Sequence, residues 1–319
     1  MKLNWHCFKC QIKTHDVSKG AMLINQSLYG AKRLITGLFL FSLLSACSVQ
    51  NLLLRNAGDI LSKETSASDE DLELLMHASA YHLKLSESLL QEIPNHAKLA
   101  ESVARGYTQY AFVFLMDEAD RIESDSLQKA NQLRTRAAKI LMRAQSNGLK
   151  TLNLLYPQLG TYLNNPAQRP AFKIKPEDTG LVYWTMTAWA GGISLSKDSP
   201  DVVADLPQVL RLAELAWQAS PQYDQGALAS MMGTLELAKP GGQNGIAEKY
   251  FDMAIAWRES QIAPLISKAE NWAVATQNRS AFEQLLKQAI DLGHNKSDLI
   301  NTVMTRRARW LLDNADNLF

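Results

Sequence analysis

Helical periodicity without strand signals is the feature that most limits the folds open to this 319-residue chain. Apolar and small residues recur three and four positions apart, which places them on one face of a helix. In the first such segment they are Leu72, Leu75, Met76, Ser79, Ala80 and Leu83. No segment alternates apolar and polar residues over the length of a strand, and no Asn-Gly turn joins two β-branched runs. The sequence therefore predicts an all-α protein of stacked antiparallel helix pairs.

Turn and cap signals divide this pattern into separate helices. Pro94 ends the first helix, and Gly148 is the expected left-handed C-cap of the third. Residues 157–176 contain the longest turn-rich stretch. The expected helices cover residues 72–83, 97–115, 127–147 and 180–195, and a further helix starts at Pro200.

A weak internal repeat accompanies the helices. Ala144, Ala216, Ala254 and Ala289 lie late in helical segments and are 72, 38 and 35 residues apart. These gaps are close to two, one and one tetratricopeptide units of about 34 residues, in which a small alanine lets two helices approach. We therefore expect degenerate tetratricopeptide-like repeats. A generic helical bundle with well-placed alanines is the alternative interpretation.

The N-terminal segment has the features of a bacterial lipoprotein signal. Lys32-Arg33 precedes the apolar run Leu34–Leu44, which is too short to span a bilayer. The run leads into Leu44-Ser45-Ala46-Cys47, in which small residues fit the signal peptidase and the thiol of Cys47 receives the lipid. Ser48 follows instead of aspartate, which favours sorting to the outer membrane, where the protein would face the periplasm. An ordinary buried cysteine at a helix end is the alternative.

Cleavage before Cys47 predicts three parts: a signal peptide over residues 1–46, a lipidated tether over residues 47–71 and one helical domain over residues 72–319. Translation from Met22 would make residues 1–21 a mis-assigned extension. Within that extension, Cys7 and Cys10 with His6 and His15 resemble half of a zinc site, but no second Cys/His pair follows at a suitable spacing. We therefore expect no metal ion.

The charge balance of the mature chain limits its partners. Six of the 33 basic residues but only one of the 32 acidic residues precede Cys47, so 27 basic and 31 acidic side chains remain, a net charge near −4. The mature chain has no basic stripe to bind nucleic acid and no polybasic patch to bind anionic lipid. Cys47 is its only cysteine, so we expect no disulfide.

Motifs for catalysis and cofactor binding are absent. The chain contains no phosphate-binding loop, no nucleophile elbow and no His-Glu-x-x-His zinc motif. Asp117 and its acidic neighbours up to Asp125 could serve acid–base chemistry, but a solvated helix face with an Asp117–Arg121 pair explains them better. We expect neither an enzyme nor a cofactor.

Aromatic residues on helical faces are the remaining candidates for a binding site. We expect a pore or ligand site lined by Tyr107, Tyr110, Phe114, Tyr183, Trp184 and Trp189. Small residues beside Trp189, from Ala190 to Gly192, leave room for a cavity or for a close helix approach. Packing of these rings between helices is the alternative.

From Leu90 to Phe319 the chain resembles the T component (TatT) of TRAP (tripartite ATP-independent periplasmic) transporters. The resemblance is carried by the stretches Gly106–Asp120, Leu181–Asp198, Ala204–Pro207, Pro221–Asp224, Arg306–Leu311 and Asp316–Phe319. It implies tetratricopeptide-like helix pairs around an apolar pore, assembly as a trimer, and pairing with the periplasmic solute-binding protein of the transporter.

Two functions follow from these observations. The first is an accessory lipoprotein of a TRAP transporter that binds the solute-binding protein and passes on a small apolar or organic-acid ligand. The second is a tetratricopeptide-type adaptor lipoprotein that helps to assemble outer-membrane or secretion machinery. The identity of genes next to this one would discriminate between them.

Overall fold

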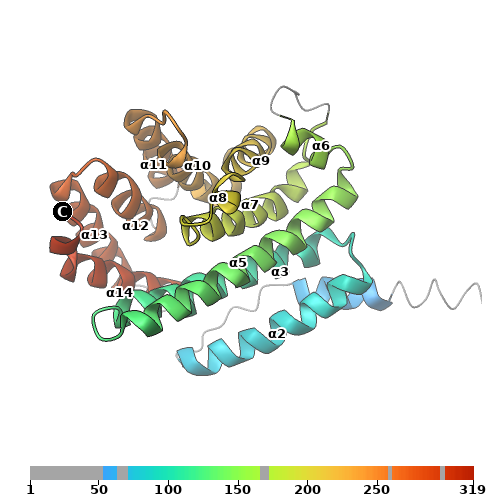
Figure 1. Ribbon diagram of the computed structural model, residues 1–319, viewed down its shortest axis with the longest axis horizontal. Coiled ribbons are helices and arrows are strands. Elements are labelled where there is room, and N and C mark those ends of the chain that lie inside the picture. The colour runs from blue at the N-terminus through green and yellow to red at the C-terminus, as the bar shows by residue number, and fades with distance from the viewer. Residues whose placement is uncertain (1–52, 63–70, 166–171, 258–260, 295–298) are drawn as a thin grey trace, which may run out of the picture. The chain divides into compact units, whose positions relative to one another are not determined.

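The computed structural model describes residues 53–62, 71–165, 172–257, 261–294 and 299–319 (Figure 1). The chain divides into two units, Met1–Leu53 and Leu54–Phe319, and every described residue except Leu53 lies in the second, which is compact. The predicted signal peptide, the lipidation site Cys47 and the half zinc site lie outside the described residues.

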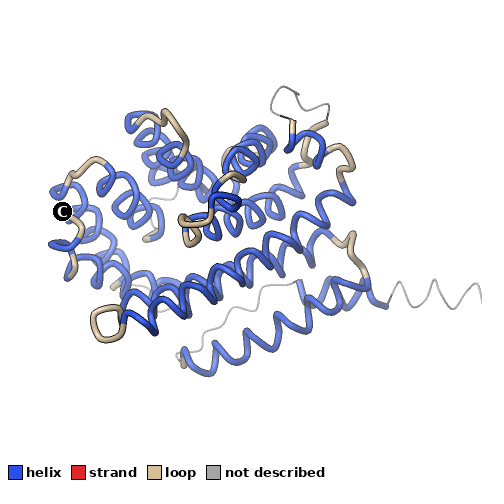
Figure 2. The backbone as a smooth tube through the Cα atoms, in the orientation of Figure 1, coloured by secondary structure: helices blue, strands red, loops and turns tan. Residues whose placement is uncertain are grey.

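The described residues form helices and no strand, which confirms the all-α prediction (Figure 2). A helix over residues 53–62 occupies part of the predicted tether. The helices that follow are α2 (Leu72–Glu92), α3 (Ala97–Tyr110), α4 (Asp117–Ile122), α5 (Leu127–Leu155), α6 (Leu159–Asn164), α7 (Thr179–Ser194), α8 (Pro200–Val203), α9 (Leu206–Ala219), α10 (Ala227–Ala238), α11 (Asn244–Trp257), α12 (Ala263–Lys268), α13 (Arg279–Gly293) and α14 (Leu299–Asp313). None of the helices searched in the described chain combines the length and apolar character that crossing a membrane would need.

Polar side chains cap several of these helices at their N-termini. The Asp71 carboxylate accepts hydrogen bonds from two backbone N–H groups at the start of α2. The side chains of Ser126 and Asn278 each accept one backbone N–H at the start of α5 and α13. His96, the residue before α3, is buried and accepts the Leu99 N–H at 3.1 Å through Nδ1. Each cap satisfies a backbone donor that has no partner within its helix.

Two hydrophobic cores lie within the second unit. The larger core is built mainly from α2, α3, α5, α7 and α9, and the smaller from α11 to α14. Helices that are close in the chain pack together, as α5 does with α7 and α10 with α11. The four alanines of the predicted repeat are all fully buried, as close helix approach requires.

Gly148 does not end a helix, so its predicted role as a C-cap is wrong. Helix α5 continues through it to Leu155. A Cβ atom at this position would lie only 2.0 Å from Thr185 Oγ1 of α7. The glycine is therefore needed for close packing of two helices, a contact that local sequence does not reveal.

Two more details differ from the sequence-based expectations. The helix expected over residues 97–115 continues beyond α3 as a π-helix, η1 (Ala111–Met116), which leads directly into α4. A second π-helix, η4 (Ala269–Ala273), follows α12. The turn-rich stretch over residues 157–176 contains the short helix α6, whose Leu159, Tyr162 and Leu163 are buried. These apolar side chains join the larger core and stabilise helical structure that the turn residues alone do not favour.

Candidate functional site

Helix α7 carries three of the six aromatic residues proposed to line a site. Most of its residues are buried, including Leu181, Val182, Met186 and Ala188, so it lies inside the larger core. Two glycines allow its close packing: a Cβ on Gly191 would lie 3.1 Å from both Leu141 and Phe112, and one on Gly192 would lie 2.6 Å from Met142. The small residues beside Trp189 therefore serve close helix contacts.

Tyr183 and Trp184 form an aromatic group with Tyr223, which the sequence analysis did not select. The ring centroids of Tyr183 and Trp184 are 5.0 Å apart, and those of Tyr183 and Tyr223 are 5.1 Å apart. Burial raises the pKa of Tyr223, and the nearby Glu101 charge raises it further. The hydroxyl is therefore neutral at physiological pH. Half-buried rings with polar edges form this group, which suits a small molecule with an apolar body.

Trp189 lies apart from this group, deep in the core. Its side chain is 2% exposed, and its indole N–H donates to Asp205 Oδ2 at 3.1 Å. Asp205 precedes α9, so the bond joins α7 to the start of α9. The indole is thus packed on its apolar surface and satisfied at its polar atom.

Tyr107, Tyr110 and Phe114 lie at a different place, along α3 and η1. The rings of Tyr110 and Phe114 are 5.3 Å apart, whereas the Tyr107 hydroxyl donates to Glu87 Oε2 at 3.1 Å. The Arg143 guanidinium lies 5.6 Å from the Tyr107 ring centroid. Of the six predicted residues, the structure pairs Tyr110 with Phe114 and Tyr183 with Trp184.

Glu87 is the centre of a polar network that includes the Tyr107 hydroxyl. Its carboxylate accepts hydrogen bonds from Arg143, Lys84, Asn147 and Tyr107. Burial alone would raise the pKa of Glu87, but the four donors outweigh burial and lower it to about 2. The network joins α2 to α3 and α5 through a carboxylate that is charged at neutral pH.

A further aromatic group between α9 and α11 was missed by the sequence analysis. The Trp217 ring centroid lies 5.2 Å from that of Tyr250 and 6.3 Å from that of Trp257. All three side chains are partly exposed. Tyr250 and Trp257 are seven residues apart and therefore lie on one face of α11, a spacing that could have identified them.

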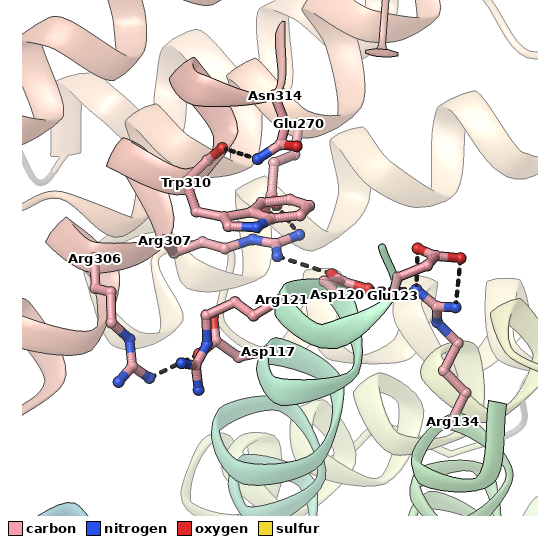
Figure 3. Close-up of polar contacts among 10 residues, drawn as sticks. All are labelled: Asp117, Asp120, Arg121, Glu123, Arg134, Glu270, Arg306, Arg307, Trp310 and Asn314. Atoms are coloured by element: carbon pink, nitrogen blue, oxygen red, sulfur yellow. Dashed lines mark hydrogen bonds and ion pairs between the residues drawn. The ribbon is translucent and has the colours of Figure 1, made fainter. Parts of the chain in front are cut away.

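A network of charged side chains joins α4 to the C-terminal helices (Figure 3). Arg306 of α14 donates to Asp117 at 2.7 Å, and Arg307 donates to Asp120 at 2.8 Å. Arg307 also binds Glu270 of η4 at 2.7 Å. The ion pairs with Asp117 and Asp120 link residues that are 189 and 187 positions apart in the chain.

The expectation of a solvated acidic face on α4 is wrong for Asp117, whose side chain is only 7% exposed. The predicted Asp117–Arg121 pair is present at 3.3 Å. Burial raises the pKa of Glu270, and the Arg307 charge opposes this effect. Both π-helices adjoin the network, since η1 ends immediately before Asp117 and Glu270 lies in η4. Such π-helices often occur at functional sites.

These groups support binding more readily than chemistry. The aromatic groups can stack on an apolar ligand, and the carboxylates described above are held by arginine, lysine, asparagine or tyrosine donors. Among the described residues, no three His, Cys, Asp or Glu side chains are placed to hold a metal ion. An open pocket of about 390 Å³ on the surface of α5 is lined by polar residues: Gln128, Asn131, Gln132 and Thr135.

Comparison with known proteins identifies a family and a relative. The family model of the TRAP transporter T-component matches residues 68–319, which cover the helical domain. An uncharacterised protein of Treponema pallidum (strain Nichols) is 24% identical over 264 residues, which are 79% of this chain and 81% of the relative.

Proposed function

Because the chain belongs to the TRAP transporter T-component family, we propose that it is a periplasm-facing accessory lipoprotein of such a transporter. The family match over residues 68–319 is the observation that carries this proposal, because it covers the helical domain over residues 72–319. The family is one of transporter components and not one of enzymes.

The partner that we propose is the periplasmic solute-binding protein of the transporter. Stacked helix pairs offer long surfaces suited to holding another protein. Trp217, Tyr250 and Trp257 add partly exposed aromatic rings, the side chains most often found at the energetic centres of protein interfaces. A trimer anchored through Cys47 in the outer membrane completes the proposed assembly.

The ligand that we propose is a small apolar molecule or organic acid, passed along the aromatic residues. Tyr183, Trp184 and Tyr223 support this idea because their rings offer apolar surface and their polar atoms can orient a ligand. The neutral Tyr223 hydroxyl can donate a hydrogen bond to a carboxylate.

A binding measurement tests the partnership. We expect the purified mature protein to bind the solute-binding protein encoded beside it with a Kd of roughly 1 μM, or about −8 kcal/mol. Trp257→Ala should weaken this binding, whereas Leu154→Ala, at an exposed position on α5, should not. No binding at high protein concentration, with or without organic acids, would instead favour an adaptor for outer-membrane or secretion machinery.

A labelling experiment tests the anchor separately. Cys47→Ala should abolish incorporation of radioactive palmitate and leave the signal peptide attached, because only the thiol can carry the lipid. Normal labelling and normal maturation of this variant would contradict the lipoprotein assignment. Ser48→Ala is the matched control and should leave both unchanged.

A further inference from the structure

Exposed apolar side chains concentrate at the N-terminal end of the described chain. Ten large apolar side chains are exposed among the described residues, and five of these lie between residues 53 and 85. Ile60 is 66% exposed, and Tyr81, at 74%, is the most exposed of the ten. Such residues normally cover a core or contact something else.

The two helices that carry these residues are held in place by their other faces. Leu54 and Leu61 pack against the larger core, and a Cβ on Gly58 would lie 3.0 Å from Ile93, so the helix over residues 53–62 fits closely beside the end of α2. A hydrogen bond of 3.1 Å from Arg55 to Asn95 adds to this contact. Ile60 is therefore displayed on a fixed surface.

Helix α2 has the same two-sided character. Leu83 and Leu90 are buried, whereas Leu74, Tyr81 and Leu85 are exposed. The three exposed residues are seven and four positions apart, which places them in one row along the helix. Ile60 and these three residues are called the outer apolar row below.

The predicted anchor restricts what can cover this row. Leu54, the first residue of the second compact unit, follows Cys47 by seven positions. Seven extended residues span at most about 25 Å. A lipid on Cys47 therefore keeps the start of this helix within about 25 Å of the membrane surface, a distance shorter than α2, whose 21 residues extend about 32 Å.

We propose that the outer apolar row rests on the surface of the bilayer that holds the lipid of Cys47. This inference depends on the proposed lipidation. The chemistry of the row suits the interface: a tyrosine between two leucines places an apolar ring and a hydroxyl at headgroup depth, where tyrosine is enriched. The row is narrow and has polar neighbours, including His77, Lys84 and Asp59, so it contacts the interface without entering the hydrocarbon core.

The charged residues beside the outer apolar row predict which lipids the row can contact. Lys84 is paired with Glu87 at 2.8 Å, and Asp59 lies 3.3 Å from His96, so the polar neighbours form no cationic patch. Contact should therefore arise from apolar burial and should not require anionic lipid. The same contact is expected on zwitterionic phosphatidylcholine vesicles and on vesicles that also contain phosphatidylglycerol.

Fluorescent labels on the full mature lipoprotein test this contact. The mature chain has no cysteine besides Cys47, whose sulfur carries the lipid, so an introduced cysteine is the only target for a thiol-reactive dye. Ile60→Cys and Tyr81→Cys place an environment-sensitive dye on the outer apolar row. Ile246→Cys, at an exposed position of α11, is the matched control.

In phosphatidylcholine vesicles, we expect the dyes at positions 60 and 81 to emit at shorter wavelength and to be quenched by brominated lipid chains. The dye at position 246 should keep its emission in water. Water-like emission at positions 60 and 81 in a lipidated protein would overturn the proposal. An emission shift that appears without vesicles, as the protein concentration rises, would also overturn it, because a second copy of the chain would then cover the row.

A second form of the protein distinguishes failure of the contact from failure of lipidation. A hexahistidine segment in place of residues 1–47 can hold the same tether on a nickel-chelating lipid. If palmitate labelling shows no lipidation, this form still reports whether the row meets the membrane. Leu74→Glu with Leu85→Glu should remove the emission shift at position 81 in both forms, and an unchanged shift would contradict the proposal.

Discussion

At the scale of single residues, the buried side chains of Glu87 and Trp189 have specific partners for their polar atoms. Glu87 is 3% exposed and accepts hydrogen bonds from four side chains, and Trp189 is 2% exposed with its indole N–H bound to Asp205. Removing one partner leaves the other polar group buried without a hydrogen bond. This costs more free energy than the hydrogen bond contributes to stability. Individual substitutions here should therefore have large and specific effects.

Glu87→Gln should make the stability of the protein less dependent on acid. The pKa of Glu87 is about 2 in the folded chain and near 4.5 when unfolded, so its charge stabilises the fold above about pH 4.5. That contribution is lost as the pH falls toward 2. Urea unfolding should show the variant less stable than the parent by about 1–3 kcal/mol at pH 7, with a smaller difference at pH 3.

Glu92→Gln is the matched control for this experiment, because Glu92 is exposed on the same helix. It should change the free energy of unfolding by less than about 0.5 kcal/mol at pH 7. If Glu87→Gln lowers the free energy of unfolding by the same amount at pH 7 and at pH 3, the charge of Glu87 is not the source of the loss.

Trp189→Ala and Trp184→Ala should separate core packing from ligand binding. Trp189→Ala creates a cavity and should cost about 3–5 kcal/mol in free energy of unfolding. Trp184 is only partly buried, so its loss should cost less stability and should reduce ligand or partner binding more. Chemical denaturation and a binding assay on both variants measure these effects. If both variants lose the same stability and still bind normally, both rings serve only to pack the core.

At the scale of helices, close approach between elements depends on small residues. Helices α5 and α7 pack tightly because Gly148 faces Thr185, and Gly191 leaves space for Leu141 and Phe112. The predicted repeat follows the same principle, since Ala144 of α5 and Ala216 of α9 are fully buried. A methyl group at a glycine contact must displace a neighbouring side chain.

Gly148→Ala should destabilise the protein even though alanine favours helix. Its Cβ would lie 2.0 Å from Thr185 Oγ1, and overpacking of this kind typically costs about 1–3 kcal/mol. Adding Thr185→Ala removes that oxygen and should restore part of the loss. Thermal unfolding of the two single variants and the double variant measures the coupling.

Gly245→Ala is the control, because a Cβ there would have no neighbour within 4 Å and the residue lies in α11. This change should stabilise the protein by up to about 1 kcal/mol through helix propensity. If Gly148→Ala stabilises the protein in the same way, the close contact between α5 and α7 is not present in solution.

At the scale of the whole described unit, ion pairs connect segments that are far apart in sequence. Arg306 and Arg307 of α14 bind Asp117 and Asp120 of α4, while Arg307 also reaches Glu270. These contacts join the larger core, to which α4 is attached through α5, to the helices of the smaller core. Glu270 lies in the π-helix η4, and the π-helix η1 ends immediately before Asp117.

Arg307→Gln should weaken the junction, because Asp120 and Glu270 would each lose a charged partner. We expect a loss of roughly 1–3 kcal/mol in free energy of unfolding. Hydrogen exchange should also speed up in α4 and α14 before it does in α7, because the junction opens first. Arg309→Gln, at an exposed position on the same helix, should do neither. Equal exchange in α4 for both variants would contradict the role of this network.

The sequence by itself determined the features that depend on neighbours along the chain. Helical periodicity identified α2, α3, α5 and α7, Pro94 separated the first two, and the alanines of the repeat were correctly placed in packed positions. The Asp117–Arg121 pair was also predictable, since residues four apart on a helix are adjacent. The motif ending in Cys47 still predicts a lipid anchor, but it lies outside the described residues.

Only the tertiary structure decided the features that join distant segments. Nothing near Gly148 in sequence indicates that Thr185 lies against it, and nothing near Asp117 indicates Arg306. Tyr223 likewise meets Tyr183 only because η3 (Tyr223–Gly226) folds against α7. The physical reason is that periodicity and capping are local properties of the chain. Burial, close contact and ion pairing depend instead on which helices the fold brings together.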